Sequence, residues 1–206
     1  MPKASAALAT LPTIPMGSGT TRQPVLASLP TGGFLSADQG VKPSSNISWD
    51  GKTLTAEEIA VIVPISETVI ADANVDVVSI VTRLITQEFG RVLDAAVFFG
   101  TNAPTTYPTG GLFGAADTAG STVEAQGATA NVAADYNSLF SALETLGFDV
   151  TNVYAGRAEK GRLRGQTDGN GLPVFVPTAG VPGVGSIYGT PLAYPLGWEP
   201  TDALAL

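Results

Sequence analysis

The sequence contains no cysteine and no histidine among its 206 residues. Without histidine there is no Ser-His-Asp triad, no HExxH zinc helix and no side chain whose ordinary pKa lies near neutrality. Without cysteine there is no thiolate nucleophile, no disulfide framework and no cysteine-bound zinc or iron–sulfur cluster. The chemistry that stays open is that of carboxylates, of serine with lysine, and of metals bound through oxygen.

Charge is also scarce, since charged residues make up 14% of the chain against about 25% in an average soluble protein. The 18 acidic and 10 basic residues give a net charge of −8, and no basic run offers an electrostatic site for nucleic acid. Hydrophobic residues reach 44%, beside 24 Gly and 15 Pro. A loop-rich chain with so little charge needs cover for its apolar surface, and a partner subunit is one source of that cover.

No targeting or membrane-spanning segment is expected. The Ala-rich start, Met1–Thr10, is followed by Pro12 and Pro15 and is too short and too interrupted for the apolar region of a secretory signal. The longest strongly apolar segment, Val75–Phe99, contains Asp, Glu and Arg residues, so it does not fit a membrane span. We therefore expect a soluble protein that is made inside the cell.

The first third of the chain is expected to be extended. Thr20–Pro30 has the composition of an edge strand, Asp50-Gly51 is the strongest hairpin-turn signal, and Lys52–Ile65 is a second β-leaning run. Residues 20–65 therefore predict a long two-stranded arm. Because such a hairpin is marginal on its own in water, we expect it to lie on something else.

The later elements are mostly helical. Apolar residues recur with helical spacing over residues 74–100, which predicts a rod of roughly 39 Å with Asn74 as its N-cap and Gly100 at its end. Residues 101–127 are expected to be a loop, 130–146 a second amphipathic helix, 148–154 a buried strand and 157–164 a short basic helix. The remainder, from residue 165, predicts short strands and turns.

Motifs for catalysis or ligand binding are weak. Glu57 and Glu58 are adjacent in a β-leaning run, so their side chains point to opposite faces and do not form an acid–base pair. Asp168–Gly171 lacks the alternating acids and the closing Glu of a calcium loop, and Gly183–Gly189 is one residue off GxGxxG and opens no helix. We expect no enzyme, no catalytic residue, no metal and no cofactor; a small carboxylate-dependent hydrolase is the weaker alternative.

A few side chains are candidates for contacts between subunits. Trp49 lies on the expected arm, where it has no core of its own to fill, and Trp is frequent at interface hot spots. Arg83 with Glu88, or Arg91 with Asp94, could form ion pairs, within the helix by default or else between subunits. The basic set between residues 157 and 164 either faces solvent or a neighbouring subunit, or binds phosphate or nucleic acid. It comprises Arg157, Lys160, Arg162 and Arg164.

Several strings, in their order along the chain, resemble the HK97-type major capsid protein of tailed phages. Residues 40–49 (GVKPSSNISW) are similar to the tip of that family's extended loop, and residues 58–66 (EIAVIVPIS) to the strand that enters its spine helix. Residues 91–100 (RVLDAAVFFG) with 110–112 resemble the end of the spine helix, and residues 152–157 and 187–192 fit the axial domain. The resemblance extends from Pro15 to Leu206.

The resemblance implies an α+β, HK97-like fold in four parts. These are an N-terminal arm (1–19), an extended hairpin loop (20–65), a peripheral domain (66–127) with the spine helix at 74–100, and an axial α/β domain (128–206). In this family the chain usually continues further, so we expect the axial domain to be incomplete and the chain to be partial. Some members crosslink through a Lys on the extended loop, and Lys42 lies near the matching region; an ordinary interface lysine is the alternative.

The implied function is that of a structural subunit of an icosahedral virion capsid. Copies of the chain would form pentamers and hexamers around packaged double-stranded DNA, which they enclose without reading its sequence. Scaffold, portal or decoration proteins are further partners that the resemblance allows, and assembly would take place in the host cytoplasm. An encapsulin-type compartment, which has a similar fold but encloses cargo enzymes, is the alternative.

Overall fold

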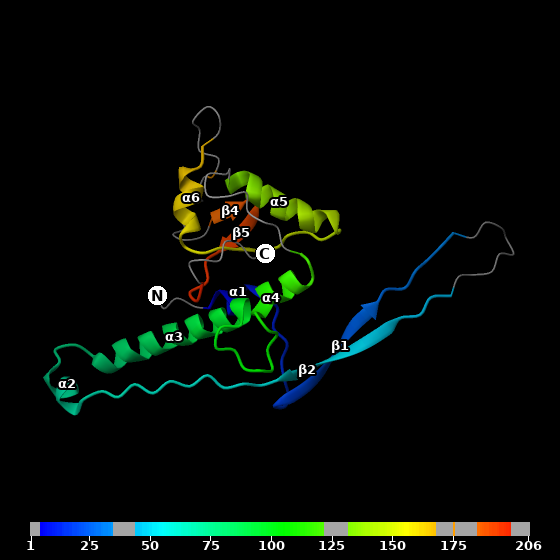
Figure 1. Cartoon of the computed structure of the whole chain (residues 1–206). Helices are drawn as coiled ribbons and strands as arrows, with labels where there is room; N and C mark the ends of the chain where they lie inside the picture. The colour runs from blue at the N-terminus through cyan, green and yellow to red at the C-terminus, as the bar shows by residue number, and fades with distance from the viewer. Residues whose placement is uncertain (1–4, 35–43, 122–131, 168–174, 176–184, 199–206) are drawn as a thin grey trace. The chain divides into compact units, whose positions relative to one another are not determined.

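The computed structural model describes residues 5–34, 44–121, 132–167, 175 and 185–198 (Figure 1). The chain divides into two compact units, which are considered separately below. Ile14–Glu58 form the smaller unit, and Met1–Thr13 together with Ile59–Leu206 form the larger.

The smaller unit is a two-stranded antiparallel ribbon of β1 (Thr20–Ser28) and β2 (Ser48–Thr55). Its register runs from Thr20 opposite Thr55 to Leu26 opposite Trp49. The expected strand at 20–30 is confirmed. The second strand begins earlier and ends earlier than the predicted run 52–65. Ala56 N still donates to the carbonyl oxygen of Gly19 at 2.8 Å, and residues 56–65 belong to no helix or strand.

Asp50-Gly51 is not the hairpin turn, so that prediction is wrong. Both residues lie within β2, and Gly51 is paired with Pro24. A Cβ on Gly51 would lie 2.1 Å from Nε of Arg22, so the glycine makes room for an arginine side chain that crosses the strand. The connection between the strands spans residues 29–47 instead.

In the larger unit, the long helix α3 (Val77–Phe99) confirms the predicted spine. Its N-cap is Asp76 and not Asn74, since the Asp76 carboxylate accepts a hydrogen bond from Ser79 N at 3.1 Å. Gly100 ends the helix in the left-handed conformation, with φ of 67°. The 23 residues give a length of about 35 Å.

Three short helices were missed or misplaced by sequence patterns. These are α1 (Ala6–Thr10), α2 (Glu67–Asp72) and α4 (Gly111–Thr118). In α4, two glycines look like loop residues, yet Gly111 serves close packing. A Cβ on Gly111 would lie 2.6 Å from the carbonyl oxygen of Val97, so only a glycine lets the start of α4 approach α3.

The rest of the larger unit combines α5 (Val132–Thr145), α6 (Glu159–Gly165) and a small mixed sheet. The sheet has the order β3-β5-β4, in which β5 (Thr190–Ala193) pairs parallel to β3 (Val153–Tyr154) and antiparallel to β4 (Gly185–Ile187). Both predicted helices are confirmed within a few residues. The predicted strand at 148–154 is reduced to its last two residues.

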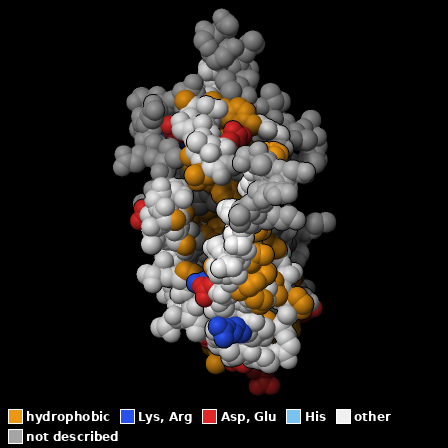
Figure 2. Space-filling model, turned by 90° about the vertical axis from the view of Figure 1, so that its right-hand side faces the viewer, with side chains coloured by type: hydrophobic (Ala, Val, Ile, Leu, Met, Phe, Trp, Pro, Cys, Tyr) orange, Lys and Arg blue, Asp and Glu red, His pale blue; other side chains and the backbone are white. Residues whose placement is uncertain are grey.

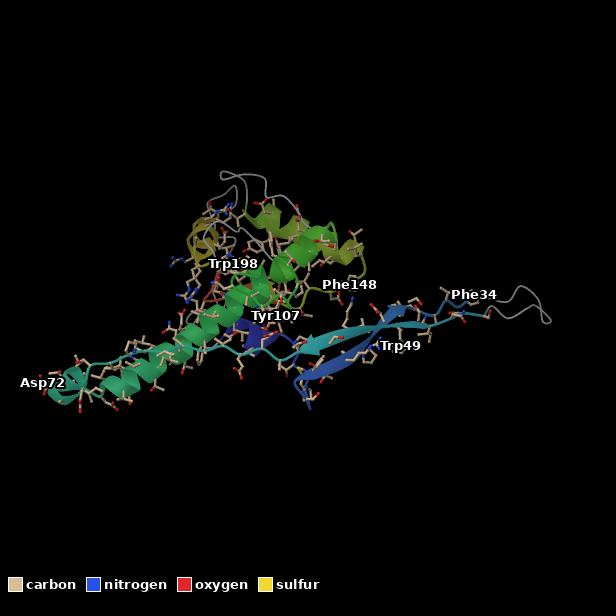
Figure 3. All side chains as sticks on the ribbon, turned by 60° about the horizontal axis from the view of Figure 1, so that its bottom comes forward. Phe34, Trp49, Asp72, Tyr107, Phe148 and Trp198 are labelled. Carbon is tan, nitrogen blue, oxygen red and sulfur yellow. The ribbon has the colours of Figure 1, made fainter. Side chains whose placement is uncertain are left out.

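The sheet separates two apolar cores, because successive side chains of a strand point to opposite faces. Val153 packs with α5 and α6, whereas its neighbour Tyr154 packs against Phe98 of α3 at a ring-centroid distance of 4.7 Å. The second core also includes Trp198, whose ring lies 4.8 Å from that of Phe99. Figure 3 shows Trp198 among the helices of the larger unit.

Asp94 joins three segments that are far apart in the sequence. It is fully buried, and its carboxylate accepts hydrogen bonds from Ser5 Oγ at 2.5 Å, Ala6 N at 3.1 Å, Ala7 N at 3.1 Å and Leu196 N at 3.1 Å. The start of α1 and the chain after β5 are thus both fastened to α3. The expected ion pair between Arg91 and Asp94 does not form, because backbone and hydroxyl donors occupy the carboxylate.

Gly197 allows this junction to close. A Cβ at this position would lie 2.4 Å from the carbonyl oxygen of Arg91 and 2.6 Å from Ala95 N. We expect Gly197→Ala to destabilise the subunit by about 2–3 kcal/mol, since backbone atoms of α3 cannot yield as a side chain would. Urea unfolding followed by circular dichroism measures this, with Gly161→Ala as the control, because a Cβ on Gly161 meets nothing within 4 Å. Equal stability of the two variants would contradict the packing role.

Candidate functional site

The candidate site in the described part of the chain is a set of surfaces. Within it, no group of three or more acidic side chains is placed to hold a metal ion. No helix in the described residues has the length and apolar content needed to cross a membrane. The features that stand out are apolar side chains left exposed on each unit.

The first of these surfaces lies on the ribbon of the smaller unit, and we call it the hairpin apolar surface. Trp49 has 66% of its area exposed, and it faces Leu26 across the two strands. Figure 3 shows Trp49 on this ribbon and Phe34 on the connection beyond its strands, away from any apolar core within the unit. The members of the surface lie on both faces of the ribbon and on the described ends of the connection between its strands. They are Val25, Leu26, Leu29, Phe34, Ile47 and Trp49.

The second surface lies in the larger unit, and we call it the spine apolar surface. It begins in residues 59–65, which belong to no helix or strand, and there Ile62 is 92% exposed. Figure 2 looks from the right-hand side of Figure 1, whereas α2 and the start of α3 lie at its left, so it shows a different face; hydrophobic side chains are exposed there too, with few charged side chains among them. The members of the spine apolar surface are Ile59, Val61, Ile62, Val63, Val69, Ile70, Val75, Val78, Ile80 and Leu84.

The spine apolar surface exists because α3 is covered over only part of its length. All of its buried residues lie at or after Gly90, where α1, α4 and the segment around Gly197 pack on it. The residues before Gly90 keep the apolar helical stripe but have no buried member. Within this part of the helix Val77, Val81 and Ile85 are half-buried. Val78, Ile80 and Leu84 are exposed, and large hydrophobic side chains left exposed together mark a surface that needs a partner.

Two of the charged candidates on α3 form a local pair. Arg91 donates to Glu88 through Nη2 at 2.6 Å and through Nε at 2.9 Å. The hydrogen bond from Arg91 holds the pKa of Glu88 below its ordinary value. Both side chains are exposed, so the pair contributes little stability. Arg83 lies exposed on α3 and is not brought to Glu88.

The basic candidates lie at α6. Arg162 donates to Glu159 at 2.8 Å, and the ammonium of Lys160 lies 4.2 Å from the centre of the Tyr194 ring. Arg157 is exposed just before the helix. Among the candidates that lie in the described residues, the structure brings Glu88 and Arg91 together. Lys42 and Asp168–Gly171 lie outside the described residues.

Two tyrosines beside this helix should make the subunit sensitive to alkali. Burial raises the pKa of Tyr136 above its ordinary value of 10.0 and raises that of Tyr194 to about 12, so folding favours their neutral forms. The resulting stability is present in full below pH 10.0 and is lost as the pH rises towards the pKa values of the folded state.

We therefore expect the urea midpoint of the subunit to fall above about pH 10, and Tyr136→Phe to make that fall shallower. Midpoints measured between pH 8 and 12 test this. An identical decline in the wild type and in Tyr136→Phe would contradict the assignment.

Comparisons with known proteins point in one direction. A family model described as the Phage capsid family matches residues 4–194. No curated protein sequence matches the chain. The exposed surfaces are thus found in a chain that resembles shell-forming proteins over most of its length.

Among solved structures, a chain from Microbacterium phage Oxtober96 is 42% identical, with a TM-score of 0.78 over 97% of this chain and 68% of its own. A chain from Mycobacterium phage Cain is 29% identical, with a TM-score of 0.80 over 98% of this chain and 66% of its own. The capsid of a native GTA particle, at 18% identity and a TM-score of 0.64, shares the fold. The chain spans about two thirds of the length of the phage chains that it matches.

Proposed function

Since this chain belongs to the phage capsid family, as an HK97-type major capsid protein that is structural and not enzymatic, we propose that it assembles into pentamers and hexamers of a closed icosahedral shell. Capsid proteins of this family associate with copies of themselves. The finer parts of the proposal are the arrangement of the copies, the surfaces that they use and the contents of the shell.

The observation that carries the proposal is the amount of exposed surface. Each unit leaves large hydrophobic side chains exposed, among them Trp49 at 66% in the smaller unit and Ile62 at 92% in the larger. Apolar side chains exposed in such number mark surfaces that bind other proteins. Stable interfaces bury about 800 Å² per partner or more, so contacts with neighbouring copies would cover these side chains.

We assign roles to the parts of the chain on the same basis. Residues 1–19 act as the N-terminal arm, 20–65 as the extended loop, 66–127 as the peripheral domain and 128–206 as the axial domain. Trp49 supports the role of the extended loop in contacts between copies, because it is exposed on a ribbon with no core. Arg83, Arg157 and Arg162 are proposed as charged contacts at the rims of such interfaces, where they would affect specificity more than affinity.

The proposed content of the shell is packaged double-stranded DNA, with scaffold, portal or decoration proteins as possible partners in assembly. The test is treatment of purified particles with nuclease, followed by extraction of what they retain. We expect protected DNA of uniform length. Particles that retain protein cargo and no DNA would contradict the virion function and support a compartment of the encapsulin type.

A further inference from the structure

Beyond α3, every basic residue of the chain lies in α6 or just before it. No lysine or arginine occurs between Arg91 and Arg157, and none follows Arg164. The sequence before this group is acidic, since all the charged residues from 92 to 156 are Asp or Glu. In this part of the chain, positive charge is therefore concentrated at one place.

Two of these arginines lie on the same side of α6. Arg157 and Arg164 are seven positions apart in the sequence, which is about two helical turns. Both are exposed, and neither forms an ion pair with another described residue. Lys160 lies between them, with its ammonium over the Tyr194 ring. We call Arg157, Lys160 and Arg164 the α6 basic face.

Exposed carboxylates lie at the far end of α5. Glu144 and Asp149 are both exposed, and no ion pair of the described residues includes either of them. Between them in the sequence, Leu146 is 63% exposed and Phe148 is 65% exposed. We call these residues the α5 tip. The α5 tip belongs to neither the hairpin apolar surface nor the spine apolar surface.

The α5 tip is negative and has a fixed shape. The C-terminal end of a helix carries a partial negative charge, and the last turn of α5 has no basic residue to offset it. Gly147 follows the helix with φ of 84°, and Phe148 N donates to the carbonyl oxygen of Leu143 at 3.2 Å. The two carboxylates are thus held where a cationic partner is favourable.

The two surfaces lie on opposite sides of one group of elements. The start of α5 is joined to the end of α6, where Val132 N donates to Oε1 of Gln166 at 3.3 Å. The 14 residues of α5 span about 21 Å, so the α5 tip lies away from α6. Figure 1 shows α6 and the far end of α5 at opposite sides of this group, and Figure 3 shows Phe148 past the end of α5.

We propose that the α5 tip of one copy docks on the α6 basic face of the next copy, an inference that rests on the shell-forming function proposed above. The carboxylates of the tip accept hydrogen bonds from Arg157 and Arg164. The aliphatic stems of these arginines cover Leu146 and Phe148. Because the two surfaces differ and lie on opposite sides, the contact joins copies head to tail, and contacts of this kind can close into rings.

Charge reversal tests the contact in the full chain. Glu144→Lys with Asp149→Lys gives the tip the same sign as the α6 basic face, and Arg157→Glu with Arg164→Glu makes the α6 basic face acidic. Each pair should raise the protein concentration needed for assembly at least about tenfold, because like charges then meet. All four substitutions together restore opposite charges and should return this concentration to near the wild-type value. Light scattering during assembly measures it.

A matched control separates this contact from a general effect of charge. Asp149→Lys alone should raise the assembly concentration by about threefold or more, whereas Asp117→Lys, which reverses an exposed carboxylate of α4, should leave it unchanged. The unassembled variants should unfold in urea as the wild type does, since the substituted side chains are exposed.

Two kinds of failure are distinguishable. Wild-type shells whose assembly the reversals leave unchanged, or a fourfold variant that assembles no better than the pairs, would overturn this contact and leave the proposed function standing. A wild type that forms no shells would contradict the proposed function itself, and this contact with it.

Discussion

Asp94→Ala is expected to lower the free energy of unfolding by about 3–5 kcal/mol. The substitution removes one buried carboxylate and leaves the Ser5 hydroxyl and three backbone N–H groups without an acceptor. Each buried donor without a partner costs about 1–3 kcal/mol; relaxation of the start of α1 into solvent limits the total. Urea unfolding followed by circular dichroism measures the loss.

Two further variants test whether the lost hydrogen bonds cause this loss of stability. Asp149→Ala removes an exposed carboxylate of the same unit and should change stability by no more than about 0.5 kcal/mol. Asp94→Asn keeps the shape but turns an NH₂ group towards N–H donors, so it should be nearly as damaging as the alanine. A loss below about 1 kcal/mol for Asp94→Ala would show that α1 is not fastened through this carboxylate.

Trp49→Ala is expected to raise the protein concentration needed for assembly by at least about 30-fold, which corresponds to a hot spot of about 2 kcal/mol. The stability of the unassembled subunit should fall by less than about 0.5 kcal/mol, because the side chain is 66% exposed. Light scattering during assembly and urea unfolding of the subunit give the two quantities separately.

Lys52→Ala is the matched control for Trp49. It removes an exposed polar side chain from the same strand, and we expect assembly to begin at an unchanged concentration. Equal losses of assembly and of subunit stability in Trp49→Ala would place this tryptophan in a core of its own subunit. That outcome would show that the hairpin apolar surface does not contact neighbouring copies through Trp49.

Local sequence patterns predicted the elements that are determined by residues close together in the sequence. The spine helix and α5 were found because an apolar stripe with helical spacing needs only neighbouring residues to be read. Gly100 was recognised as the end of α3 because a left-handed residue at a helix end favours glycine. Asp50-Gly51 misled because the same dipeptide that suits a turn here accommodates the side chain of Arg22.

The junction at Asp94 could not be predicted in the same way. Its hydrogen bonds join residues that lie 87 to 102 positions apart, and no local pattern records such a separation. The sequence suggested only that Asp94 could pair with Arg91, three residues away. A sparse signal did exist, since an Asp on the apolar stripe of a helix demands partners from elsewhere in the fold.

Local sequence patterns could not predict that the spine apolar surface is exposed. An apolar stripe looks the same in sequence whether it packs within its own chain or against another copy. The structure separates the two cases, because the residues buried on α3 all lie at or after Gly90.

A cryo-electron-microscopy reconstruction of the purified, assembled protein tests the central claim most directly. The account predicts closed shells with fivefold and sixfold clusters, in which neighbouring copies cover Trp49, Leu26 and Ile62. Particles that leave these side chains facing solvent, or a chain that remains a dispersed monomer with the same surfaces exposed, would contradict it.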